Sequence, residues 1–263
     1  MPSEDTDERY RAPALDKGLD ILELLAHSAE NLTQAEIAKE LGRSPNETYR
    51  MLTTLVRRGY VLKDLSGESY QLSLRLFTLA HRHPPMGRLI QQALPLMRHA
   101  AQRAQQSCHI SVEQSGQLVI VASIEAPGNW GLSLRAGSSV GLYNTATGRV
   151  LAAFRSRNDC ERLIASHELA DGERALARNE FDTVLDAVRE RGYERMPSAT
   201  AMGVTNLGYP ILGPDGNAIA ALVCPYLERI DAHVSPSIDE VASIIAEVAA
   251  KLSMSTPRKI AAE

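Results

Sequence analysis

The chain has 263 residues, of which 44% are hydrophobic and 23% are charged, and its formal net charge at pH 7 is −4. This composition is typical of a folded globular protein and excludes a chain that is disordered throughout. No uncharged apolar run approaches the roughly 18 residues that a membrane-spanning helix needs. The polar, acidic start predicts a flexible tail over residues 1–10 rather than a signal peptide. The three cysteines are odd in number and widely spaced, which favours a reduced, cytoplasmic protein.

Basic residues are concentrated in one short segment of this acidic chain. Five of them lie between Arg43 and Lys63, together with a single acid, Glu47, so the segment carries a local charge of +4. Clustering of this kind favours contact with the phosphates of a nucleic acid, and a solvated helix face is the alternative.

The first part of the chain predicts two helices with recognisable signals. Leu15, Leu19 and Leu22 recur at helical spacing and predict the first helix. Thr33 and Glu36 have the spacing of a capping box, in which each residue hydrogen-bonds the other's backbone N–H. A short second helix is therefore expected to start after Thr33.

A third helix and a hairpin follow. The segment Ser44 to Glu47 repeats the capping-box pattern, with Pro45 at the first helical position, and the helix runs to about Arg58. Two capped helices separated by a short break indicate a helix-turn-helix. After Gly59 the apolar period changes to two, which predicts a hairpin. Residues 11–72 are thus expected to form a winged helix-turn-helix.

The rest of the chain predicts a linker and a mixed α/β domain. Leu72, Leu76 and Leu79 predict a linker helix, and Pro84-Pro85 a hinge, over residues 73–87. Residues 88–263 form the second domain, which makes the fold class α+β with two domains. Its expected helices are 89–106, 145–155, 159–165, 180–191 and 236–252, and its expected strands are 108–112, 118–124, 132–135, 207–212 and 218–223.

The outer face of the third helix carries side chains suited to DNA. Arg favours guanine and Asn favours adenine in the major groove, while residues late in the helix and in the wing meet phosphates. Glu47 can accept a hydrogen bond from cytosine, but its position favours a capping role. The predicted DNA-binding residues are Arg43, Ser44, Asn46, Tyr49, Arg50, Thr53, Arg57, Arg58 and Lys63.

No motif predicts catalysis, a metal or a cofactor. His81 and His83 have no further ligand nearby in sequence, so a solvated linker is favoured over a metal site. Cys108 and His109 are strand neighbours that point to opposite faces and cannot form a nucleophilic pair. Cys160 and Cys224 are interpreted as buried small residues. Trp130 is interpreted as core packing, with a cavity wall or subunit contact as the alternative.

Several segments share order and spacing with one known family. In the N-terminal part they are 14–25, 32–38, 49–52, 58–61 and 70–76; in the C-terminal part they are 135–137, 142–149, 191–193, 203–204 and 210–222. Among them are Leu142-Tyr143-Asn144-Thr145-Ala146-Thr147-Gly148-Arg149 and Arg191-Gly192-Tyr193. Over residues 12–253 the chain resembles the IclR family of bacterial transcriptional regulators.

This resemblance implies a winged-helix DNA-binding domain, a linker helix and a GAF-like α/β effector-binding domain with an antiparallel sheet. It also implies a homodimer or a dimer of dimers on a palindromic operator. It places an effector pocket at the loop before residue 146 and at the strand after Gly203-Val204.

The loop before residue 146 opens into a predicted helix, whose first N–H groups attract a carboxylate. The expected ligand is a small organic acid, with aromatic acids included, and the alternative is that Asn144 and Thr145 only cap the helix. The predicted effector-binding residues are Leu142, Tyr143, Asn144, Thr145, Ala146, Met202, Asn206 and Cys224.

The sequence therefore predicts a ligand-responsive DNA-binding transcriptional regulator that is not an enzyme. Its expected partners are operator DNA, a small-molecule effector and further copies of itself, and no membrane. Two alternatives remain: a sensor module whose helix-turn-helix contacts protein, and a metabolic enzyme built on the C-terminal domain. Salt-dependent binding to one palindromic DNA site would distinguish the DNA-binding regulator from the sensor module.

Overall fold

The computed structural model describes residues 12–64, 67–81, 84–129, 131–231 and 233–255, with only the backbone given for residues 80, 81 and 84–86. Contacts divide the chain into two compact units, residues 1–87 and residues 88–263. Each unit has its own hydrophobic core, so each is described by itself.

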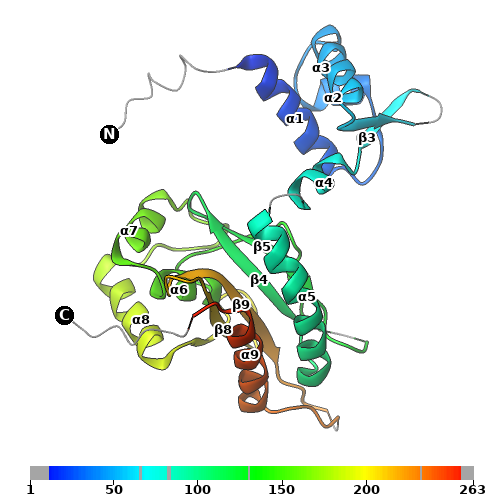
Figure 1. Ribbon diagram of the computed structural model, residues 1–263. Coiled ribbons are helices and arrows are strands. Elements are labelled where there is room, and N and C mark those ends of the chain that lie inside the picture. Colours follow the sequence, from blue (N-terminus) through cyan, green and yellow to red (C-terminus); the bar gives the residue numbers. More distant parts are fainter. Residues whose placement is uncertain (1–11, 65–66, 82–83, 130, 232, 256–263) are drawn as a thin grey trace. The chain divides into compact units, whose positions relative to one another are not determined.

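The N-terminal unit packs three helices against a small antiparallel sheet of order β1-β3-β2 (Figure 1). Its elements are α1 (Pro13–His27), β1 (Leu32–Thr33), α2 (Gln34–Glu40), α3 (Pro45–Arg57), β2 (Val61–Lys63), β3 (Ser69–Leu72) and α4 (Arg75–His81). Its core consists of one or two apolar side chains from each main element: Ile21, Leu25, Ile37, Leu52, Val61 and Tyr70.

Local signals set the ends of these helices. The N–H of Glu36 donates to Oγ1 of Thr33 (3.3 Å) and the N–H of Thr33 donates to Oε2 of Glu36 (2.7 Å), so the predicted capping box is confirmed. Gly42 and Gly59 follow α2 and α3 with φ of 61° and 74°. Glycine adopts this left-handed conformation without steric cost, which lets the chain turn away after each helix.

The C-terminal unit is built on a six-stranded antiparallel sheet of order β6-β5-β4-β9-β8-β7. Its strands are β4 (Cys108–Gln114), β5 (Gln117–Ile124), β6 (Ser139–Val140), β7 (Glu194–Pro197), β8 (Val204–Leu212) and β9 (Ala218–Leu227). Its helices are α5 (Pro84–Ala104), α6 (Ala146–Ala153), α7 (Arg157–Ser166), α8 (Arg178–Arg191) and α9 (Ile238–Leu252).

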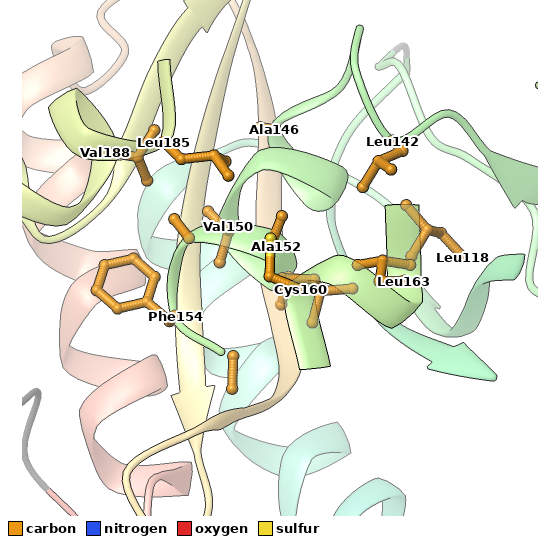
Figure 2. Packing of buried hydrophobic residues seen from close by; sticks show 14 of the residues in the cluster. Leu118, Leu142, Ala146, Val150, Ala152, Phe154, Cys160, Leu163, Leu185 and Val188 are labelled. Carbon is orange, nitrogen blue, oxygen red and sulfur yellow. The ribbon is translucent and has the colours of Figure 1, made fainter. Parts of the chain in front are cut away.

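Helices cover both faces of this sheet (Figure 1). α5 and α9 lie on one face, where Arg103 of α5 pairs with Glu247 of α9 (2.9 Å). α6, α7 and α8 lie on the other face. Figure 2 shows the buried apolar side chains around α6, including Val150, Leu185 and Leu118. The start of α6 is therefore held between the sheet and α8.

Some elements differ from those predicted. Residues 132–135 form no strand, and the edge strand β6 lies at Ser139–Val140 instead. The short strands β1 and β7 were not predicted, because two to four residues carry too little periodicity. Pro84 and Pro85, predicted to form a hinge, begin α5, since the first turn of a helix tolerates proline. The predicted tail, His83 and Trp130 lie outside the described residues.

Candidate DNA-binding surface and effector site

Helix α3 presents a continuous polar stripe to solvent. Thr48 and Leu52 are buried against the rest of the unit. At 3.6 residues per turn, five predicted side chains fall within an arc of about 100° on the opposite side. All five are exposed: Asn46, Tyr49, Arg50, Thr53 and Arg57. The structure thus brings together amide, phenol, hydroxyl and two guanidinium groups on one face.

The N-terminal end of α3 is fixed differently from the sequence prediction. Oγ of Ser44 accepts from the N–H of Glu47 (3.3 Å), which is one half of the second capping box. The other half is absent: the Glu47 carboxylate pairs with Lys17 of α1, which holds the pKa of Glu47 below its usual range. Arg43 likewise pairs with Asp20 of α1. These two predicted residues link α3 to α1, so the prediction of a capping role for Glu47 is wrong.

Two further basic residues continue the surface beyond α3. Arg58 follows the helix and is exposed. Lys63, on β2, is exposed and lies over the ring of Tyr70, with its Nζ 5.2 Å from the ring centroid. In the described part of the chain neither basic residue forms an ion pair, and both charges are available to an anionic partner.

The loop before α6 is held by its own side chains. Oγ1 of Thr145 donates to the carbonyl of Gly141 (2.6 Å) and accepts from the N–H of Gly148 (3.1 Å), which caps the helix. Ala146 is buried and packs over Gly208 of β8. Oδ1 of Asn144 is buried and has no hydrogen-bond partner within the described residues.

Ionic side chains, buried or partly buried, hold both sides of the Tyr143 backbone. Its N–H donates to Oε1 of Glu173 (2.6 Å), and Oε2 of Glu173 lies 2.9 Å from Nε2 of His167. Its carbonyl accepts from Nε of Arg149 (3.1 Å), whose guanidinium also contacts Glu194 (3.3 Å). Burial raises the pKa of Glu173, but hydrogen bonds from backbone N–H groups and His167 outweigh it, so the pKa is lowered. Sequence patterns did not predict Glu173 and Glu194 as part of this site, because Glu173 lies 30 residues from Tyr143 and Glu194 lies 45 residues from Arg149.

The predicted effector residues do not all meet at this loop. Leu142 and Tyr143 are core residues; the Tyr143 ring packs edge-on against Phe181, with ring centroids 4.8 Å apart. Asn206 lies opposite Met196, a member of the α6-side core, and so faces α6.

Two of the predicted effector residues lie elsewhere. Cys224 pairs with Leu207, the neighbour of Asn206, so strand alternation turns the Cys224 thiol toward α5. Met202 is 93% exposed on a turn. The structure therefore does not bring Cys224 or Met202 to the side chain of Asn206.

The described residues contain no group of three potential metal-ligating side chains. None of the described helices is long and apolar enough to cross a membrane. The three cysteines are buried free thiols, and burial raises the pKa of Cys108 to about 12.

Each of the two units matches a known protein-family model. The family model "IclR helix-turn-helix domain" matches residues 14–65, and the model "Bacterial transcriptional regulator IclR C-terminal" matches residues 86–254. The chain belongs to the IclR family of bacterial transcriptional regulators. It therefore combines a DNA-binding helix-turn-helix with an effector domain, and the family comprises regulators rather than enzymes.

Individual relatives agree with this assignment. The chain is 29% identical to the HTH-type transcriptional regulator KdgR of Escherichia coli over 204 residues, which is 77% of each chain. It is 28% identical to the glycerol operon regulatory protein of Streptomyces coelicolor, over 75% of this chain and 78% of that protein.

The fold matches that of an IclR homolog from Microbacterium hydrocarbonoxydans in complex with 4-hydroxybenzoate. The TM-score is 0.72, with 20% identity over 91% of this chain and 97% of that chain. The sequence predictions of family, fold class and absence of enzymatic function are confirmed.

Proposed function

We propose that the protein binds a palindromic operator as a homodimer or a dimer of dimers, with α3 in the major groove. The observation that carries this proposal is the exposed stripe of α3. Arg50 and Asn46 supply base contacts, while Arg57, Arg58 and Lys63 supply phosphate contacts. One winged helix reads only a short half-site, so a specific operator requires two. As a regulator of transcription, the protein acts in the cytoplasm.

We assign residues 11–72 to the winged helix-turn-helix, 73–87 to the linker and 88–263 to the effector domain. Leu76 and Leu79 on α4 are large apolar side chains that are more than one-third exposed. Exposed apolar side chains on a short helix are favourably buried against a second copy of the chain. This supports a contact between subunits through the linker helix α4.

The effector in this proposal is a small organic acid bound at the start of α6. The first N–H groups of a helix lack intrahelical acceptors and carry a partial positive charge, which suits a carboxylate. Asn144 and Asn206 add donors and acceptors, while the backbone fixed by Glu173 and Arg149 keeps the loop in place. The 4-hydroxybenzoate of the homologous structure is an acid of this class.

A binding experiment tests this function. The protein is titrated into labelled DNA from the region upstream of its own gene, with footprinting to locate the site. One protected palindrome, steep salt dependence and weaker binding when an organic acid is added would support the proposal. Salt-independent binding, or no protected site on any genomic fragment, would contradict it and favour a protein-contact module.

A further inference from the structure

A cavity lies where β9 leaves the sheet, next to the last turn of α5. Its volume is about 270 Å³, near the lower end of the range for small-molecule sites. Its walls come from three separate parts of the C-terminal unit: the end of α5, the loop after β5, and the end of β9 with the loop that follows it. Segments that are remote in sequence thus border a space that fits a small ligand.

This cavity is separate from the start of α6. The start of α6 packs over Gly208, which pairs with Val223 of β9. Leu227, which lines the cavity, lies four residues further along β9, or about 13 Å away. None of the described residues that line the cavity belongs to the proposed effector site. A ligand in the cavity therefore leaves the effector site free.

Side-chain hydrogen bonds hold the walls of the cavity together. Nε2 of Gln106 donates to the carbonyl of Leu227 (3.0 Å), and Oε1 of Gln106 accepts from the N–H of Leu227 (3.1 Å). These two bonds tie the end of β9 to the end of α5. Nε2 of His233 lies 2.8 Å from Oε1 of Gln105, which ties the loop after β9 to the same place. Walls that are already fixed reduce the entropic cost of binding.

Two glutamine amides in the lining are available to a ligand. Gln102 and Gln105 both line the cavity. The amide of Gln102 and the amide nitrogen of Gln105 make no hydrogen bond to any residue that the structure describes. Gln105 directly follows α5 with φ of 51°, in the left-handed region that glycine usually occupies at a helix end. Residues held in such strained conformations cluster at ligand sites.

The lining favours a ligand without charge. The described residues that line the cavity include no carboxylate and no ammonium group. Arg229 lines it, but its Nε donates to Oδ1 of Asp231 (3.0 Å), so an acid of the chain already balances this charge. Amide groups both donate and accept hydrogen bonds, as hydroxyl groups do. Pro127 and Leu227 add apolar surface for C–H groups.

We propose that this cavity binds a neutral sugar or polyol of monosaccharide size through the amides of Gln102 and Gln105. This inference goes beyond the proposed function, which assigns an organic acid to the start of α6. The effector domain then binds two ligands that differ in charge, at two sites that can be occupied together.

Saturation-transfer-difference NMR on the full-length protein tests binding. The probes are D-glucose and D-xylose, together with sorbitol and xylitol, the open-chain polyols of the same carbon number. We expect at least one of the four to bind with a Kd of about 10 mM or below, as for a small ligand held by a few hydrogen bonds. A preference within a pair tells whether the site takes a ring or an open chain. No binding by any of the four would overturn the inference.

Variants of the two glutamines test the assigned contacts. Both side chains are exposed, so Gln102→Ala and Gln105→Ala should keep the Tm of the wild type. Each should raise the Kd about threefold to tenfold, as the loss of one hydrogen bond does. Gln117→Ala is the matched control, since Gln117 is exposed at the other end of β5 and does not line the cavity. An equal Kd in all three variants would overturn the inference.

A competition experiment separates this inference from the proposed function. Adding 4-hydroxybenzoate should not displace the bound sugar or polyol, because the acid is assigned to the start of α6. Displacement would place both ligands in one site and overturn the inference. Sugar binding by a protein that binds no organic acid would support the inference and contradict the proposed effector, whereas acid binding without sugar binding would contradict the inference alone.

Discussion

At the scale of single residues, the loop before α6 depends on charges that lie far away in sequence. Glu173 accepts hydrogen bonds from the N–H groups of Tyr143 and Ala170 and contacts His167. Nδ1 of His167 faces the carbonyl of Gly116 (2.8 Å), so the same pair also links the β4–β5 turn to the loop. The two carboxylate oxygens together serve three donors, which is more than one amide oxygen can do.

Glu173→Gln should therefore loosen this loop. Because one hydrogen-bond acceptor is lost in a fully buried site, we expect the free energy of unfolding to fall by about 2–4 kcal/mol. Hydrogen exchange of the Tyr143 amide should accelerate, as measured by NMR. Glu113→Gln is the control, since it breaks a partly buried ion pair with Arg155, and Glu113 makes no hydrogen bond to residues 141–145 among the described residues. Equal acceleration in both variants would contradict a specific role for Glu173.

Protonation of His109 should make stability depend on pH. Its pKa is lowered from 6.5 to about 4 by burial, so between these values the unfolded chain binds a proton that the folded chain does not. Stability should decrease by about 3 kcal/mol as the pH falls from 7 to 4. Denaturant titrations of the wild type and His109→Phe check this. An identical pH dependence in the variant would show that His109 is not the group responsible.

Sequence reasoning succeeded at residues whose role follows from one helix. The exposed stripe of α3 was predictable because helical periodicity alone decides which side chains share a face. The orientation of Cys224 was not, since it depends on the register between β8 and β9. Glu173 was missed because it lies 30 residues from Tyr143, its hydrogen-bond partner.

At the scale of elements, close backbone contact positions the start of α6. An added Cβ at Gly148 would lie 2.1 Å from the carbonyl oxygen of Leu142. The helix and the preceding loop can approach this closely only because residue 148 has no side chain. Capping signals and apolar periods predicted most helices, whereas the edge strands β1 and β6 have two residues each and left no pattern.

Gly148→Ala should therefore separate α6 from the loop. We expect a loss of about 1–3 kcal/mol in the free energy of unfolding, as for other overpacked sites, together with weaker effector binding. Gly18→Ala in α1 is the comparison, because an added Cβ there meets nothing within 4 Å. That change should be stabilising through helix propensity. Circular dichroism during denaturation measures both, and wild-type stability of Gly148→Ala would contradict the contact.

At the scale of the whole molecule, regulation requires subunits as well as domains. The exposed Leu76 and Leu79 of α4 are the apolar residues that we assign to a subunit contact. Sequence periodicity predicted this helix, but Leu72, which was assigned to the same stripe, lies on β3. A spacing of three or four residues between apolar side chains cannot tell whether the first of them ends a strand or begins the following helix.

Light scattering at micromolar concentration should show a dimer or tetramer. The double variant Leu76→Glu with Leu79→Glu should dissociate more readily, since charges on an apolar contact are costly to bury. Operator affinity should fall with it, because two half-sites are then bound independently. A wild-type monomer that binds the operator tightly would refute this assignment.

The salt dependence of operator binding tests the central claim most directly. Affinity is measured by fluorescence anisotropy at several salt concentrations for the wild type, Arg50→Ala, Arg57→Ala and the control Arg157→Ala on α7. Arg57→Ala should flatten the salt slope by about one unit per subunit, and Arg50→Ala should cost about 1–3 kcal/mol and relax one operator position. Arg157→Ala should bind as the wild type does. Unchanged affinity and slope in both α3 variants would contradict the account.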